Sequence, residues 1–200
     1  MIISLKNKKA LVTGGGTGIG QSIAKALADA GAKVAFTSRK TSSLKETYKL
    51  LGNNSKHFPC KIDLYKKGSV DKLYKKLKKN FGTVDIIVNN IGHTLNKKDP
   101  FTPLKNWEKS LRLNFLTAVG VVNRFVLDMK KKNWGRIVNI TSVAGMEISG
   151  PSTYNASKAA LTAYTKSVGR ALALEKKNVV MTAVAPGVIV TKKGYWNKKT

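Results

Sequence analysis

The sequence predicts an α/β fold: a doubly wound parallel sheet with helices on both of its faces. Short apolar segments rich in β-branched residues alternate with longer segments whose apolar residues recur every three or four positions. Chains that alternate strands and helices in this way form parallel sheets covered by helices. No linker, repeat or low-complexity tract divides the 200 residues. We therefore predict a single domain that spans residues 1–200.

Six strands are predicted from short apolar runs bounded by polar or turn-forming residues. The first run, Lys9-Ala10-Leu11-Val12, stops at a cluster of glycines, and the last run ends at Pro186-Gly187. The predicted strands are residues 9–12, 33–38, 56–62, 84–89, 136–141 and 179–184. Ligands of such sheets bind beyond the carboxyl ends of the strands. We expect a site among the residues that follow them: Gly14, Arg39, Asp63, Asn90, Ser142 and Pro186.

Five helices are predicted between these strands, at residues 21–28, 42–51, 66–81, 104–131 and 153–174. In the third helix the apolar residues Val70, Leu73, Tyr74, Leu77 and Phe81 recur with helical spacing, and lysines lie between them. These lysines should cover the solvent-exposed face. The fourth and longest helix should bury one apolar stripe: Trp107, Leu111, Phe115, Val119, Val122, Val126 and Met129.

The net charge of +27, from 37 basic and 10 acidic residues, is unusually high. A field of this sign attracts polyanions without sequence specificity. However, the lysines lie on predicted solvated faces, and no arginine-rich cluster with interleaved aromatic residues is present. We predict no specific nucleic-acid partner, only weak non-specific adhesion at low salt.

Other composition features narrow the class of protein. Cys60 is the only cysteine, which excludes an internal disulfide and agrees with a reducing cytoplasm. His57 and His93 are the only histidines, and neither has metal-ligand spacing, so no metal site is predicted. No apolar run approaches the length of a membrane span, and residues 1–6 are too short for a signal peptide. We predict a cytoplasmic protein without a membrane segment.

A glycine-rich turn follows the first strand and opens into the first helix. Glycines at this point let the backbone approach a pyrophosphate, which lies at the amide-rich start of the helix. The spacing is Gly14-x-x-x-Gly18-x-Gly20 rather than the common G-x-G-x-x-G. The turn therefore favours a nucleotide site over a purely structural role.

Tyr154 and Lys158 form a second candidate site, with Ser142 a short distance upstream. Residues four apart on a helix share one face and lie about 6 Å from each other. A nearby ammonium stabilises a phenolate, and a shift of the tyrosine pKa from about 10 to about 7 requires about 4 kcal/mol. Lys158, together with a cationic cofactor ring, should supply that stabilisation. This pair predicts a proton-transfer site.

Six motifs together resemble the short-chain dehydrogenases/reductases over essentially all 200 residues. They are Thr13–Gly20, Asn89-Asn90-Ile91-Gly92, Asn114, Ser142, Tyr154-x-x-x-Lys158 and Pro186-Gly187. Two departures stand out. Ile91 occupies a position where the family usually has alanine, and the chain stops at Thr200, where family members continue through a substrate-covering helical segment and a last strand. The resemblance thus implies a Rossmann-type fold without its C-terminal part.

The resemblance implies a role for each residue of the second site. Tyr154 exchanges a proton with the substrate oxygen while a nicotinamide exchanges a hydride with the adjacent carbon. Ser142 hydrogen-bonds that oxygen. Lys158 lowers the pKa of Tyr154 and binds the nicotinamide ribose. Asn114 kinks its helix and binds a water that links Lys158 to solvent.

The end of the second strand indicates the cofactor. A carboxylate there would bind the adenosine ribose and repel a 2′-phosphate, but the chain has Thr37-Ser38-Arg39-Lys40. Ser38 and Arg39 can bind a phosphate, so NADP(H) is favoured over NAD(H). By resemblance, Asp63 lies near the adenine amino group, Leu64 beside the ring, and Ile189 and Thr191 near the carboxamide and phosphates. The full predicted cofactor set is Gly14, Gly16, Thr17, Gly18, Ile19, Gly20, Ser38, Arg39, Asp63, Leu64, Asn90, Gly92, Tyr154, Lys158, Pro186, Gly187, Ile189 and Thr191.

The leading hypothesis is an NADP(H)-dependent oxidoreductase that interconverts a small-molecule carbonyl and a secondary alcohol, as 3-oxoacyl reductases do. By resemblance it forms a homodimer or homotetramer through its long helices. Three alternatives stay open: an NAD-dependent alcohol or sugar dehydrogenase, a non-catalytic nucleotide- or polyanion-binding protein, and a truncated form that binds cofactor but turns over weakly.

Overall fold

The computed structural model describes residues 3–96, 99–147 and 150–190, and the predicted alternation of parallel strands and helices is confirmed within them. The contacts divide the chain into two compact units. The first unit comprises residues 1–90 and 188–200, and the second comprises residues 91–187. The single domain stays a prediction, and each unit is described separately.

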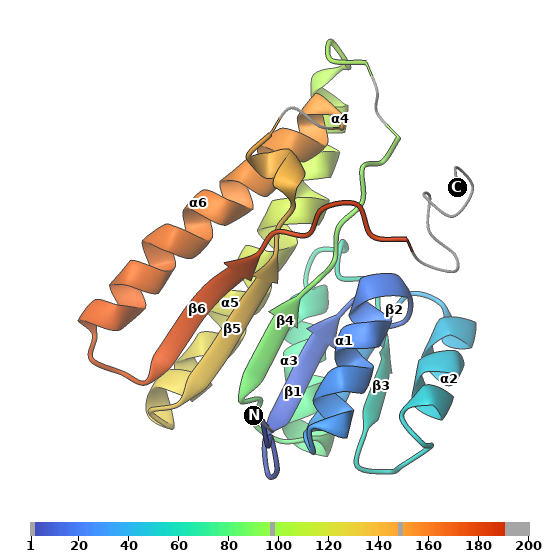
Figure 1. The fold of residues 1–200 in the computed structure, drawn as a ribbon, viewed down its shortest axis with the longest axis vertical. Helices are drawn as coiled ribbons and strands as arrows, with labels where there is room; N and C mark the ends of the chain where they lie inside the picture. The colour runs from blue at the N-terminus through green and yellow to red at the C-terminus, as the bar shows by residue number, and fades with distance from the viewer. Residues whose placement is uncertain (1–2, 97–98, 148–149, 191–200) are drawn as a thin grey trace. The chain divides into compact units, whose positions relative to one another are not determined.

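The first unit contains four parallel strands in the order β3-β2-β1-β4. The strands are β1 (Lys9–Thr13), β2 (Lys33–Ser38), β3 (Phe58–Lys61) and β4 (Ile86–Asn89), and the helices are α1 (Gly18–Asp29), α2 (Thr41–Leu50) and α3 (Ser69–Asn80). Figure 1 shows α1 in front of these strands and α3 behind them. Leu11 and Phe36, on the two central strands, are fully buried, as expected for a parallel sheet covered on both faces.

Helix α3 has the predicted amphipathic pattern. Leu73 and Leu77 are fully buried, and the lysines between them are exposed. The helix begins at Ser69 rather than Lys66, because residues 66–68 form a turn before it, and it ends at Asn80, one residue before the predicted Phe81. In this helix the lysines lie on the solvent-exposed face, as the sequence predicted.

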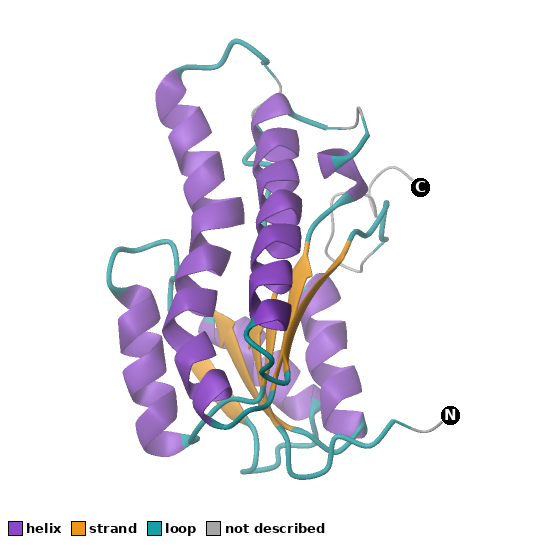
Figure 2. Ribbon diagram, turned by 90° about the vertical axis from the view of Figure 1, so that its left-hand side faces the viewer, coloured by secondary structure: helices purple, strands orange, loops and turns teal. Residues whose placement is uncertain are grey.

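The second unit pairs two parallel strands, in register from Gly135–Val179 to Ile140–Val184. Its elements are α4 (Leu104–Leu111), a π-helical turn (Arg112–Leu116), α5 (Thr117–Lys131), β5 (Gly135–Ile140), a 3₁₀ turn (Val143–Gly145), α6 (Ser152–Leu174) and β6 (Val179–Val184). Figure 2 shows the continuous α4–α5 column and α6 as two long helices that stand side by side.

The predicted helix at residues 104–131 is correct in extent, but its buried stripe is wrong. Val122 and Met129 are buried, whereas Trp107, Leu111, Phe115, Val119 and Val126 are only partly buried. The buried positions of the first half are instead polar: Asn106, Ser110, Asn114 and Thr117. The π-helical turn interrupts the 3.6-residue period on which the prediction relied. Hydrophobic periodicity cannot detect a buried face made of hydrogen-bonded polar residues.

None of the helices in the described ranges has both the length and the hydropathy that crossing a bilayer requires. The cytoplasmic location stays a prediction.

Candidate active site

The glycine-rich turn of the first unit has a backbone that only glycine fits well. Gly14 and Gly18 have φ angles of 67° and 55°, in the left-handed region. A Cβ on Gly15 would lie 2.8 Å from Cβ of Phe36, and a Cβ on Gly16 would lie 2.7 Å from Cβ of Ser38. The turn therefore packs closely on β2 and forms a cradle without side chains at the start of α1. Such a cradle fits a pyrophosphate.

Three side chains, from Thr47, Gln21 and Asn90, donate hydrogen bonds to the backbone carbonyl oxygens of this turn. The Thr47 hydroxyl on α2 is fully buried and lies 3.2 Å from the carbonyl oxygens of both Gly15 and Gly16. Nε2 of Gln21 donates to the Gly16 carbonyl oxygen at 3.4 Å and to Thr47 Oγ1 at 2.9 Å. Nδ2 of Asn90 lies 3.2 Å from the Gly14 carbonyl oxygen. Because the protein satisfies these carbonyls itself, the N–H groups at the start of α1 are the ones suited to an anion.

Thr47 and Gln21 were missed by the sequence analysis. A threonine and a glutamine on amphipathic helices carry no signal of their own. Only the fold brings Thr47 against a turn that lies far from it in sequence. Asn90 was predicted as a cofactor ligand, and its side-chain amide instead donates to the carbonyls of Thr13 and Gly14. In this structure Asn90 shapes the turn, and direct contact with a cofactor stays a prediction.

The residues predicted to bind the adenosine half lie at the ends of β2 and β3. The Ser38 hydroxyl is half-buried and accepts a hydrogen bond from the backbone N–H of Lys40 at 3.2 Å, and Arg39 is exposed. Oδ1 of Asp63 accepts from the Tyr65 backbone N–H at 3.1 Å, so Asp63 stabilises a turn and does not cap α3. Leu64 is buried. Their roles toward a cofactor stay predictions.

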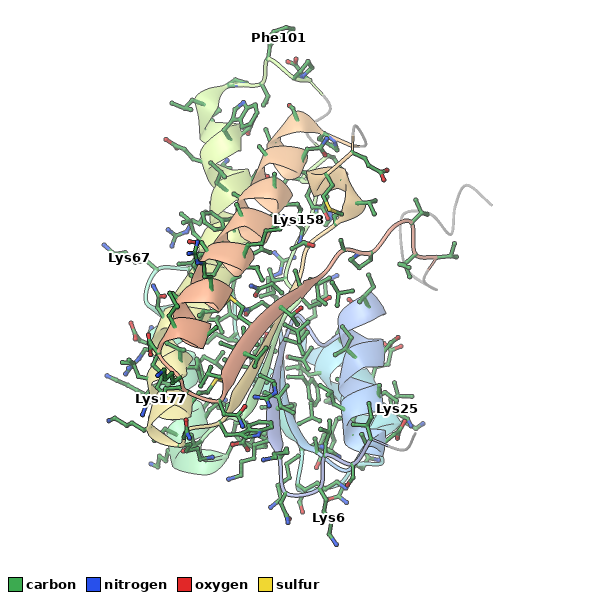
Figure 3. All side chains as sticks on the ribbon, turned by 60° about the vertical axis from the view of Figure 1, so that its left-hand side comes forward. Lys6, Lys25, Lys67, Phe101, Lys158 and Lys177 are labelled. Carbon is green, nitrogen blue, oxygen red and sulfur yellow. The ribbon has the colours of Figure 1, made fainter. Side chains whose placement is uncertain are left out.

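In the second unit, Lys158 is the centre of the predicted catalytic group. Its side chain is only 2% exposed, and Nζ donates a hydrogen bond of 2.7 Å to the carbonyl oxygen of Ile140, the last residue of β5. Nζ also lies 5.7 Å from the centroid of the Tyr154 ring, one turn earlier on α6. Figure 3 labels Lys158 on α6, and its burial contrasts with the exposed Lys67 and Lys177, which are labelled in the same view. The two predicted residues are thus together.

Burial shifts the pKa values of both residues. It lowers the pKa of Lys158 from 10.5 to about 8, because a low dielectric disfavours the ammonium. It raises the pKa of Tyr154, and a hydrogen bond with Ser142 opposes this shift. The expected lowering of the Tyr154 pKa by Lys158 is therefore not found. The Lys158 amine binds the Ile140 carbonyl, and desolvation of the phenol dominates. At neutral pH Tyr154 is a neutral phenol, the form that donates a proton.

Two glycines allow close packing around Lys158. A Cβ on Gly92 would lie 3.0 Å from Lys158 Nζ and 3.2 Å from Asn114 Oδ1. A Cβ on Gly145 would lie 2.8 Å from the backbone of Lys158 and Ala159. Gly145 thus lets the 3₁₀ turn that follows Ser142 pack directly on α6. The sequence analysis missed this residue, since single glycines are common in loops of every kind.

Asn114 lies in the π-helical turn and is 1% exposed. Its Oδ1 accepts from the backbone N–H of His93 at 2.7 Å, and its Nδ2 donates to the His93 carbonyl at 3.1 Å. The same Nδ2 lies 3.0 Å from the Ser110 carbonyl oxygen, one turn earlier. The helix has π rather than α geometry at Asn114. The kink and the bound water that the resemblance implies stay predictions. The Asn114 side chain also fixes the backbone next to Gly92.

Ser142 and the Pro186-Gly187 segment lie at the carboxyl ends of β5 and β6. Ser142 Oγ accepts from the Ala144 N–H at 3.2 Å, and the Val143 N–H donates to the Pro186 carbonyl at 3.1 Å. Gly187 is exposed. Ile189 belongs to the first unit and is 46% exposed. Thr191 lies outside the described residues.

The structure thus brings the predicted residues together within each unit. Gly92, Asn114, Ser142, Tyr154, Lys158 and Pro186 group in the second unit, and Gly14–Gly20, Ser38, Arg39, Asp63, Leu64 and Asn90 follow the strands of the first. Over the part of the chain that the structure describes, no three His, Cys, Asp or Glu side chains gather as a metal site would require.

Comparisons with known proteins agree with this arrangement. A family model for the short chain dehydrogenases matches residues 8–198. The 3-oxoacyl-[acyl-carrier-protein] reductase of Aquifex aeolicus is 36% identical over 194 residues, which cover 96% of this chain and 77% of that protein. Among solved structures, L-sorbose reductase from Gluconobacter frateurii, complexed with NADPH and L-sorbose, has a TM-score of 0.90 at 26% identity, covering 100% of this chain and 75% of its own. A 7α-hydroxysteroid dehydrogenase complexed with NADH has a TM-score of 0.87 at 28% identity, covering 95% and 74%.

The lowered pKa of Lys158 predicts a specific pH dependence of stability. Below about pH 8 the amine is protonated in both the folded and unfolded states, and its burial costs about 3 kcal/mol. Between about pH 8 and about pH 10.5 the unfolded state binds the additional proton, so stability rises with pH. The free energy of unfolding of the wild type, minus that of Lys158→Met, should therefore rise by about 3 kcal/mol across this range, measured by urea denaturation.

Lys166→Met is the matched control, because Lys166 is exposed on the same helix. Its difference from the wild type should not change in this way. A pH-independent difference for Lys158→Met would show that the folded protein does not bury a charged amine at this position.

Proposed function

Because the chain belongs to the short-chain dehydrogenase family, we propose that it is an NADP(H)-dependent enzyme that interconverts a carbonyl and a secondary alcohol. It is an oxidoreductase of this family. The observation that carries the finer proposal is the pairing of a half-buried Tyr154 with Ser142 on one side and the buried Lys158 amine on the other.

The residues of the second unit fit proton transfer to a substrate oxygen. Burial keeps Tyr154 protonated at neutral pH, so its hydroxyl can donate a proton as the carbonyl oxygen gains charge. The single Ser142 hydroxyl proton can be donated to the substrate oxygen, or to the phenolate that remains after the proton has moved. The Lys158 ammonium stabilises that phenolate electrostatically until solvent returns the proton. In the reverse direction each proton moves the opposite way.

A nicotinamide cofactor supplies the hydride when it is bound. The residues present fit such a group, since Gly15 and Gly16 leave a cradle that a Cβ would fill and the turn carbonyls are already satisfied. We assign the pyrophosphate to this turn and the nicotinamide ribose to Lys158 and Tyr154. The remaining predicted contacts, from Asp63 to Thr191, belong to the same proposal.

The preference for NADP(H) is supported by the end of β2. Ser38 and the exposed Arg39 follow the strand, and no carboxylate stands there to repel a 2′-phosphate. The similar solved structures include one complexed with NADPH and one with NADH, so both cofactors occur among such proteins. The proposal therefore depends on the charge and hydrogen-bonding capacity of Arg39 and Ser38.

We propose 3-oxoacyl thioesters as the first substrate class to test, because the Aquifex aeolicus relative is a 3-oxoacyl reductase. We propose sugars as the second substrate class to test, because the similar reductase from Gluconobacter frateurii is complexed with L-sorbose. We also propose a homodimer or homotetramer. The partly buried Trp107, Leu111 and Phe115 of the α4–α5 column support it, because a second copy can cover this apolar surface.

Tyr154→Phe should abolish proton transfer without disturbing the fold. General acid catalysis contributes about 10²- to 10⁴-fold, so kcat for reduction of acetoacetyl-coenzyme A by NADPH should fall by at least about 100-fold. The dissociation constant of NADPH should change by less than about twofold, measured by fluorescence titration. Tyr164→Phe, half-buried on the same helix, is the control and should keep its activity. Turnover by Tyr154→Phe at the wild-type rate would refute the proposed acid.

Arg39→Ala should weaken NADPH binding selectively. A charge-assisted hydrogen bond contributes about 1.5 to 3 kcal/mol, which corresponds to an increase in the NADPH dissociation constant of about 10- to 150-fold. NADH has no 2′-phosphate, so its dissociation constant should change by less than about threefold. Arg170→Ala, at an exposed position of α6, controls for the loss of one positive charge. Equal weakening of both cofactors would contradict the proposed phosphate contact.

A further inference from the structure

Three buried polar side chains, those of Ser110, Asn114 and Ser157, connect α4, the π-helical turn and α6 within the second unit, together with the backbone carbonyl of Thr153. Ser110, Thr153 and Ser157 are fully buried, and Asn114 is 1% exposed. Asn114 is the only one of them that the sequence analysis selected. Buried polar groups of this kind are costly unless they are hydrogen-bonded to one another, so their arrangement is informative. We call them the Ser110 cluster.

Ser110 Oγ is the centre of this cluster. It lies 3.1 Å from Asn114 Nδ2, 3.0 Å from the Thr153 carbonyl oxygen and 3.1 Å from Ser157 Oγ. Ser157 Oγ donates its own proton to the Thr153 carbonyl at 2.6 Å. Nδ2 of Asn114 can only donate, so the Ser110 hydroxyl accepts from it and donates its own proton to the Thr153 carbonyl on α6. The hydrogen bonds therefore run from Asn114 through Ser110 to α6.

The two partners of Ser110 on α6 are the sequence neighbours of the proton-transfer pair. Thr153 directly precedes Tyr154, and Ser157 directly precedes Lys158. One hydroxyl on α4 thus contacts the backbone or side chain next to each member of the proton-transfer pair. We propose that Ser110 is a positioning residue, which fixes the first turn of α6 and the Asn114 side chain in the geometry that the reaction requires.

Asn114 is also connected to the Lys158 amine through the backbone of Gly92 and His93. Asn114 bonds to both backbone groups of His93 that face it, at 2.7 and 3.1 Å. The neighbouring Gly92 packs so closely on Lys158 that a Cβ there would lie 3.0 Å from Nζ. Ser110 therefore acts on Lys158 from two sides: through Ser157 on the helix, and through Asn114 and the Gly92–His93 backbone.

A hydroxyl at position 110 does what an aliphatic side chain cannot. An apolar residue would fill the space but would accept nothing from the Asn114 amide and donate nothing to α6. The amide would keep its bonds to the carbonyls of Ser110 and His93, so the protein should still fold. We expect a loss of alignment rather than a loss of structure, and catalysis is sensitive to alignment.

Ser110→Ala and Thr165→Val form a matched pair of variants. Thr165 also lies on α6, is buried, and accepts a hydrogen bond of 2.9 Å from the side-chain amide of Asn139. Its replacement removes the same kind of hydroxyl–amide bond, about two turns beyond Lys158. Both variants should lower the thermal midpoint. Only Ser110→Ala should change the kinetics of the folded enzyme.

The inference rests on the proposed roles of Tyr154 and Lys158. For acetoacetyl-coenzyme A reduction by NADPH, Ser110→Ala should lower kcat about fivefold, the equivalent of one neutral hydrogen bond, with KM for the thioester within about twofold. Thr165→Val should keep kcat within about twofold of the wild type. A kcat for Ser110→Ala within twofold of the wild type, or an equal loss in both variants, would overturn the proposal.

A second measurement does not depend on turnover. Hydrogen exchange of the Asn114 side-chain amide, followed by NMR, should be faster in Ser110→Ala by about fivefold or more and unchanged in Thr165→Val. If the wild type reduces no carbonyl, the proposed function fails, and the exchange experiment still shows whether Ser110 holds Asn114. Unchanged Asn114 exchange in Ser110→Ala would refute the positioning role even in an active enzyme.

Discussion

The hydrogen bond between Nζ of Lys158 and the carbonyl oxygen of Ile140, 2.7 Å long and almost fully buried, is the constraint on which the catalytic group depends. An ammonium that loses its water is destabilised unless its surroundings are closely adapted to it. Ile140 supplies a carbonyl at the end of β5, Gly92 leaves space for the amine, and Gly145 lets the turn after Ser142 approach α6. Together these features accommodate one buried amine beside Tyr154.

The remaining lysines show how strongly environment controls the same chemical group. On α3 they lie on the solvent-exposed face and contribute to the net charge of +27. The buried face of the same helix is formed by Leu73 and Leu77. These α3 lysines are part of the solvent-exposed surface of the first unit. Lys158 differs because its burial lowers its pKa to about 8, so a modest change in its surroundings can alter its charge near neutral pH.

Much of the fold and site could be predicted because the responsible signals are local. The strand bounds at residues 33–38 and 179–184, the glycine turn and the Tyr154–Lys158 pair all follow from short sequence patterns. The missed features depend on tertiary structure. Thr47 meets the glycine turn, and Ser110 meets α6, only after the chain folds. The raised pKa of Tyr154 also reflects burial, which the one-turn spacing from Lys158 cannot reveal.

The most direct test of this account is an NMR titration of the Lys158 side chain, with ¹³Cε or ¹⁵Nζ labelling and assignment by comparison with Lys158→Met. A buried amine bonded to the Ile140 carbonyl should titrate with a pKa of about 8 in the folded protein. A pKa near the ordinary value of 10.5 would contradict the account, because it would mean that Lys158 is hydrated and that the geometry around Tyr154 is not built on a buried charge.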